Sequence, residues 1–197
     1  MFETIEKFEQ AIAAFYNAPY AVSVDCCTHA VELCLRLVNA NSVTCPTHTY
    51  VSIPLTFKKL NLQWEFEYNE WHDYYWIGNT NIIDAAVLWR KNSYISNSLM
   101  CLSFQYNKHL SLSRGGMILL DNFEQYQQLI KMSYDGRDRG PPWATQNIST
   151  IGYHYYMSPE TAQLGLEKFE NIKNIPPKKW CFADYPYLPR MEVFKFQ

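Results

Sequence analysis

The chain has 197 residues, of which 48% are hydrophobic, so it can bury a sizeable core and is too apolar to remain disordered. Its formal net charge is -2 and it has no basic tract, which excludes the charge pattern of a nucleic-acid-binding protein. No apolar run approaches the roughly 18 residues of a membrane span, and the acidic, helical N-terminus is unlike a secretory leader. We therefore expect a cytoplasmic protein with no nucleic-acid partner and no membrane association.

Helical and strand-like patterns alternate along the chain. Helices are predicted over residues 2–17, 28–39, 49–60, 122–134 and 159–172, and strands over residues 20–24, 42–45, 62–67, 81–84, 99–104 and 116–120. This alternation predicts an α/β fold in which helices cover both faces of a mostly parallel sheet, giving three layers.

The last part of the chain differs in composition from the rest. Proline-rich stretches follow the last predicted helix, and they indicate an extended C-terminal tail over residues 176–197. We expect one domain over residues 1–175, with the tail either packed across a neighbouring surface or exposed to solvent.

The six cysteines favour reduced thiols over disulfides or metal ligands. Cys26 and Cys27 are adjacent, and the other four are scattered through apolar segments without paired ligand spacing. We therefore expect no metal site, and a reducing compartment.

Three kinds of polar group are predicted at the carboxyl ends of strands, where ligands bind in such sheets. Lys108 lies between two apolar runs, and Asp84 ends a short apolar strand. Cys27 and Thr28 begin a helix whose free N–H groups and dipole favour an anion. Simpler interpretations remain open: a solvated lysine, an aspartate that caps a turn, and a threonine that only caps a helix.

An amine, a carboxylate and a phosphate cradle are together what pyridoxal 5′-phosphate requires. Several motifs in a fixed order add to this pattern: Cys26-Cys27-Thr28-His29-Ala30, Cys45-Pro-Thr-His-Thr-Tyr50, Asp84-Ala85-Ala86, Ser103-Phe104 with Lys108, Arg114-Gly-Gly and Ile151-Gly-Tyr-His-Tyr-Tyr-Met-Ser158. From about Phe8 to Phe169 the sequence resembles the DegT/DnrJ/EryC1/StrS family of sugar aminotransferases, which have the large-domain fold of type I pyridoxal phosphate enzymes.

The resemblance implies a role for each matching residue. Lys108 would form the internal aldimine and move the proton, and Asp84 would keep the pyridine nitrogen charged. Around the same cofactor it implies phosphate contacts from Cys27, Thr28 and Ser103, ring stacking by Tyr50, close approach at Ala86, and a phosphate contact from His154 of a second subunit. Tyr50 could instead be a core aromatic, and His154 a plain interface residue. The implied protein is a homodimer with a shared active site that aminates a keto group on a nucleotide-linked sugar.

Departures from the family pattern weaken the expectation of turnover. Cys27 replaces a glycine, Val87 replaces a glutamine near the cofactor ring, and Tyr156 replaces an arginine. Residues 68–77 form a short bridge where relatives have a helix and a strand, and we expect the C-terminal small domain to be almost wholly missing. The alternative is a non-catalytic, regulatory or interaction protein that keeps the fold and binds the cofactor.

Overall fold

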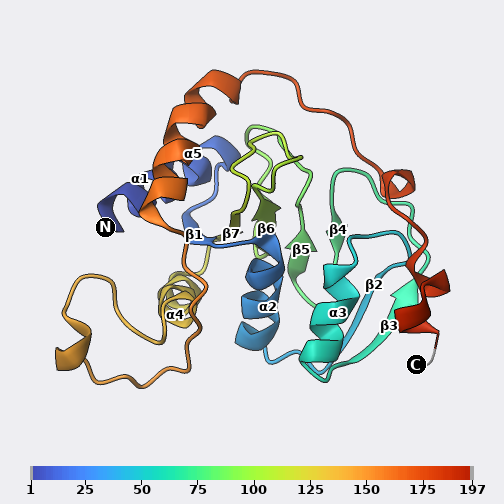
Figure 1. Ribbon diagram of the computed structural model, residues 1–197, viewed down its shortest axis with the longest axis horizontal. Helices are drawn as coiled ribbons and strands as arrows, with labels where there is room; N and C mark the ends of the chain where they lie inside the picture. The colour runs from blue at the N-terminus through green and yellow to red at the C-terminus, as the bar shows by residue number, and fades with distance from the viewer. Residues whose placement is uncertain (1, 196–197) are drawn as a thin grey trace.

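The computed structural model describes residues 2–195 and contains two sheets and five α-helices (Figure 1). The larger sheet has the strand order β1 (Tyr20–Val24), β7 (Gly116–Leu120), β6 (Leu99–Ser103), β5 (Ile82–Asp84) and β4 (Tyr75–Trp76). The smaller sheet pairs β2 (Ser42–Pro46) with β3 (Gln63–Glu67). The helices are α1 (Phe2–Tyr16), α2 (Cys27–Leu37), α3 (Ser52–Lys59), α4 (Phe123–Ser133) and α5 (Pro159–Ile172).

Helices cover both faces of the larger sheet, as the alternation of elements predicts. Successive side chains of a strand point to opposite faces. Met117 and Leu119 of β7 pack in a buried cluster with α1 and α5, whereas Ile118 and Leu120 pack in another with α2 and α4. Figure 1 shows α1 and α5 side by side; Gly165 permits this, because a Cβ there would lie 2.7 Å from the Phe8 ring. The three-layer α/β architecture is confirmed.

The expectation of a mostly parallel sheet is wrong, because most neighbouring strands of the larger sheet pair antiparallel. In the larger sheet only β5 and β6 pair in parallel, and the other three ladders are antiparallel. The chain returns from β6 to β7 through residues 104–115 without a helix, and from β4 to β5 through an even shorter link; such connections join antiparallel strands. Even so, β1, β5 and β6 point the same way, so their carboxyl ends share one edge of the sheet.

The tail, taken here as residues 176–195, packs against the chain itself. It contains three short 3-10 turns, η2 (Phe182–Asp184), η3 (Leu188–Arg190) and η4 (Glu192–Phe194). In Figure 1 it crosses from the end of α5 to the region of α3 and β3, and the backbone N–H of Leu188 donates to the carbonyl of Thr47 (2.9 Å). Among the described residues no helix has the length and apolar character needed to cross a membrane.

Candidate active site

A cavity of about 310 Å³ opens at the edge where β1, β5 and β6 end. All predicted site residues except His154 contribute to its lining: Cys27, Thr28, Tyr50, Asp84, Ala86, Ser103 and Lys108. They come from the start of α2, the β2–α3 connection, the end of β5 and the residues just after it, the end of β6 and the β6–β7 connection. The three groups singled out from the sequence, an amine, a carboxylate and a helix N-terminus, therefore face one cavity.

The start of α2 is a candidate site for an anion. Helices α4 and α5 begin with side-chain caps, since Asn122 accepts from the Gln125 N–H and Ser158 from the Thr161 N–H. Cys26 precedes α2, and within the described part of the chain its side chain makes no capping hydrogen bond. The first N–H groups of a helix have no partner inside it, and the helix dipole is positive there. The amides at this cavity wall are thus available to a phosphate.

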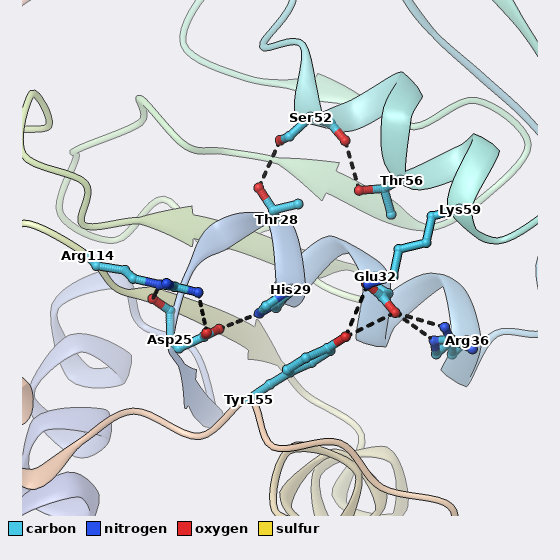
Figure 2. Close-up of polar contacts among 10 residues, drawn as sticks. All are labelled: Asp25, Thr28, His29, Glu32, Arg36, Ser52, Thr56, Lys59, Arg114 and Tyr155. Carbon is cyan, nitrogen blue, oxygen red and sulfur yellow. Dashed lines mark hydrogen bonds and ion pairs between the residues drawn. The ribbon is translucent and has the colours of Figure 1, made fainter.

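The turn between β1 and α2 is held by the three charged groups drawn in Figure 2. The Asp25 carboxylate pairs with His29 Nδ1 (2.6 Å) and with the Arg114 guanidinium (2.6 Å). Burial disfavours the His29 cation and is the largest single effect, but the contacts with Asp25 and Cys26 together outweigh it and raise the pKa of His29 to about 9. Cys26 brings a third ligand atom within 4.8 Å of Asp25 and His29, and a metal here would have to displace the His29 proton, which the raised pKa of His29 opposes. The cluster orients the turn and adds positive charge.

A second network in Figure 2 ties α2 to its neighbours. Glu32 is 1% exposed, and its carboxylate accepts from Arg36 (2.8 Å), Lys59 of α3 (2.8 Å) and the Tyr155 hydroxyl (3.4 Å). Closer to the cavity, the hydroxyls of Thr28 and Ser52 are 2.8 Å apart. A buried carboxylate bonded from several sides is costly to disrupt. The network therefore fixes α2 against α3 and residues 153–156.

Gly116 allows the start of α2 to lie against β7. A Cβ at this position would be 2.5 Å from both the Cys26 carbonyl carbon and the Cys27 nitrogen, and backbone atoms cannot give way as a side chain can. No other residue fits there without moving the anion-binding turn.

We predict that Gly116→Ala destabilises the protein by about 1–3 kcal/mol, the usual cost of overpacking, and weakens binding of pyridoxal phosphate about tenfold or more. Urea unfolding and a cofactor titration measure the two effects. Gly140→Ala is the control, because nothing lies within 4 Å of its added Cβ, although its φ of +115° adds local strain. Equal cofactor affinity in wild type and Gly116→Ala would contradict this account of the turn.

Asp84 is a buried carboxylate at the inner end of the cavity. The Tyr75 hydroxyl donates to its Oδ2 (2.5 Å) and the Ala86 N–H to its Oδ1 (3.0 Å). Burial raises the pKa of Asp84 above its ordinary value, opposed by these two bonds and by the charge of Lys108. A cation placed beside the carboxylate in the cavity would therefore be bound strongly.

Lys108 presents its amine to the same cavity. Its Nζ is 3.4 Å from the Tyr185 hydroxyl and 5.2 Å from the centre of the Trp180 ring. Within residues 2–195 it forms no salt bridge, and burial lowers the pKa of Lys108 despite the attraction of Asp84. An amine in this setting is neutral more often than a surface lysine and so is available as a nucleophile. The solvated alternative does not describe its position.

Two predicted site residues, Tyr50 and His154, are strongly exposed. Tyr50 lines the cavity and is 50% exposed, so the core-aromatic interpretation is wrong. His154 lies outside the lining, with a 70% exposed side chain, and its Nδ1 is 3.0 Å from Asp135 Oδ2. His154 does not line the cavity of its own chain. The same is expected of a residue that acts in the site of a partner subunit. Its role stays a prediction.

Several cavity residues were not predicted from the sequence, among them Ser52, Trp71, Tyr75 and Tyr185. Trp71 and Tyr75 belong to the bridge between β3 and β5, and Tyr185 belongs to the tail. An aromatic-rich bridge in place of a helix was a signal that such side chains have a packing role, but nothing in the order of residues shows that Tyr75 contacts Asp84.

The sequence matches a family profile over much of its length. Residues 1–63 and 93–185 match the DegT/DnrJ/EryC1/StrS aminotransferase family. The chain belongs to this family. The match includes Thr28, Tyr50, Ser103 and Lys108 but omits residues 64–92, so Asp84 lies outside it and its placement depends on the structure alone. No curated protein matches the chain.

Solved structures related to this family have the same fold. AtS13 from Actinomadura melliaura superposes with a TM-score of 0.74 at 19% identity over 86% of this chain and 60% of its own. The sugar aminotransferase CalS13 from Micromonospora echinospora gives 0.71 at 14% identity, with 86% and 60% covered. NtdA from Bacillus subtilis, solved with bound cofactor PMP, gives 0.67 at 14%, with 86% and 48% covered. The chain has the α/β large-domain fold of type I aminotransferases and spans about 60% of the length of the first two structures.

Proposed function

We propose that the chain binds pyridoxal 5′-phosphate and transfers an amino group to a keto group of a sugar, with a nucleotide-linked sugar as the acceptor. The observation that carries this proposal is the convergence of Lys108, Asp84 and the start of α2 on one cavity. Family membership and the neighbouring sugar aminotransferase CalS13 support the reaction class. When bound, pyridoxal phosphate supplies an aldehyde that captures amines and a ring that accepts electrons.

Each residue of the cavity then has a defined task. The amides at the start of α2, with the Thr28 and Ser103 hydroxyls, bind the phosphate, and His29 and Arg114 make the surroundings positive. Asp84 stabilises a positive charge on the ring nitrogen, and Tyr75 holds this carboxylate in place. The Lys108 amine, with its lowered pKa, takes up and releases protons at Nζ. Tyr50 would stack on the cofactor ring, and the small side chain of Ala86 would permit close approach of the ring to the cavity wall.

A homodimer with a shared active site is part of the proposal. His154 is exposed and directed to Asp135 rather than to its own cavity, and Ile151 of the same segment is 81% exposed. An exposed apolar side chain beside a family motif favours contact with a second subunit. A cytoplasmic location is likewise proposed, because all six cysteines are free thiols.

The alternative is cofactor binding without turnover. Val87 favours it, because this apolar side chain lines the cavity where the family pattern places a glutamine. The polar contact to the ring substituents that a glutamine makes is then missing on this side of the cavity. Binding depends on the phosphate and ring-nitrogen contacts, so it would survive this loss.

The absorption spectrum of the purified protein tests both the proposed amino transfer and the alternative of cofactor binding without turnover. Addition of pyridoxal phosphate is expected to give a yellow band, and addition of glutamate is then expected to bleach it as the amino group is taken up. A band that glutamate and other amino donors leave unchanged would support the non-catalytic alternative. A protein that stays colourless and does not retain the cofactor on gel filtration would refute cofactor binding altogether.

A further inference from the structure

Tyr185 of the tail meets Lys108 at the cavity wall. The Tyr185 hydroxyl lies 3.4 Å from Lys108 Nζ, and both side chains line the cavity that Asp84 also faces. We propose that Tyr185 is a positioning residue for Lys108, and that its hydroxyl holds the amine toward this cavity for condensation with the cofactor aldehyde, in which a C=N bond would replace the C=O bond and the oxygen would leave as water. The inference rests on the proposed function, since it assigns a task to that reaction's amine.

The backbone on both sides of Tyr185 is anchored. The Phe182 N–H donates to the Trp71 carbonyl (3.0 Å), and the Leu188 N–H donates to the Thr47 carbonyl (2.9 Å). Between them, His48 Nδ1 is 2.8 Å from the Tyr185 carbonyl oxygen and so donates to it. The Tyr185 ring also packs on Trp71, with centroids 5.4 Å apart. A side chain held in this way has little freedom to leave Lys108, as a positioning role requires.

Lys108 needs such a contact because it stands between two cavities. A second cavity of about 300 Å³ shares Ala86, Val87, Ser103 and Lys108 with the first and is otherwise lined by residues such as Trp89 and Trp180. The lysine stem is flexible, with about 2 kcal/mol of rotamer entropy. Without a hydrogen-bond partner on the side of the first cavity, the Lys108 side chain would populate conformations that direct the amine into either cavity. The Tyr185 hydroxyl supplies that partner.

The hydroxyl can serve both protonation states of the amine. It accepts a hydrogen bond from the ammonium form and donates one to the neutral form. Burial, and then the Asp84 carboxylate, raise the pKa of Tyr185, so it acts as a neutral phenol and not as a base. Bonds to charged groups are the stronger ones, so the hydroxyl favours the ammonium form. The other titratable groups that act on this pair are Cys27 on α2, Asp84 on β5, Tyr50 before α3 and Asp184 in the tail. Lys178 of the tail lies over the same Trp180 ring as Lys108.

Tyr185→Phe removes only the hydroxyl. Its effect is measured by stopped-flow absorbance after the cofactor-free 197-residue protein is mixed with pyridoxal phosphate. The rate of appearance of the yellow band is measured across a range of pH. We expect the plateau rate at high pH to fall about three- to tenfold, the factor that corresponds to one hydrogen bond. We also expect the midpoint of the pH profile to move to lower pH, because the ammonium form has lost an acceptor.

Tyr187→Phe is the matched control. It makes the same change two residues away in the same tail, where the ring packs on His48 (5.4 Å) and is 41% exposed. It should leave both plateau and midpoint unchanged. A lower plateau with an unmoved midpoint in Tyr185→Phe would show a purely structural effect and overturn the proposal, as would a profile identical to that of wild type. The wild-type band is recorded first, so its absence would refute the proposed function rather than this inference.

Discussion

Lys108→Ala is expected to abolish the yellow band and to lower amino transfer by at least about 10³-fold, because a positioned general base alone contributes roughly 10²–10⁴-fold. The variant loses the amine and leaves the other cavity groups in place. Since Lys108 forms no salt bridge within residues 2–195, the unfolding free energy should change little, or rise as a buried charge is removed. Absorbance, amino-transfer kinetics and urea unfolding check the three expectations.

Two controls separate the amine from its charge and from the surroundings. Lys108→Arg keeps a cation but cannot supply a neutral amine, because arginine stays protonated, so it should be as inactive as the alanine variant. Lys178→Ala removes a nearby lysine whose side chain is 62% exposed and stacks on Trp180 at 3.8 Å, and it should retain the band. A yellow Lys108→Ala protein that turns over would show that another amine serves the reaction.

Asp84→Asn is expected to lower amino transfer about 10²–10³-fold, the loss typical when one preorganised electrostatic contact is removed. The amide has nearly the same shape but cannot hold a positive charge on the ring nitrogen. Cofactor should still bind through the contacts at the start of α2, so the band remains while its conversion by glutamate slows. Single-turnover kinetics with glutamate measure this step directly.

The same substitution should stabilise the cofactor-free protein as the pH rises. Burial raises the pKa of Asp84 above its ordinary 3.8, so the folded state binds this proton more tightly than the unfolded state. That contribution is complete below the ordinary pKa and is lost as the pH rises through the raised one. The unfolding free energy of Asp84→Asn relative to wild type should therefore increase as the pH rises from the ordinary pKa of an aspartate through the raised pKa of Asp84.

Asp121→Asn is the matched control for the kinetics of amino transfer and for the pH dependence of the unfolding free energy. Asp121 directly follows β7, which runs opposite to β6, so it lies at the other edge of the sheet, where it accepts from the Asn97 N–H (2.7 Å). It should leave amino transfer unchanged. Normal glutamate conversion in Asp84→Asn would remove Asp84 from the site, and this outcome matters because Asp84 lies outside the family match.

Most of the elements and part of the cavity lining could be predicted, because each depends on short-range pattern. The apolar runs around residues 20–24, 99–103 and 116–120 are strands by composition, and the amphipathic helices have the expected period. Once strands and helices alternate, ligands bind where the strands end. Thr28, Asp84, Ser103 and Lys108 follow such ends, so their meeting was predictable.

The predicted direction of the strands is wrong because the alternation of helices and strands does not determine strand direction, whereas the connections between strands do. Residues 77–81 are too few for a helical crossover and residues 104–115 contain no helix, and both links return the chain antiparallel. β4 has two residues, too few for any periodic signal. Its Tyr75 is nonetheless the residue that holds Asp84.

What the sequence by itself determined is the set of groups at the ends of the strands, since local apolar pattern and helix starts are encoded in neighbouring residues. Only the tertiary structure decided which distant side chains complete the site. Tyr185 reaches Lys108 from 77 positions away because the tail packs on Thr47 and His48, and Gly116 admits the α2 turn because two backbones meet there. Contacts between segments far apart in the chain depend on packing of the whole domain, and no local pattern records them.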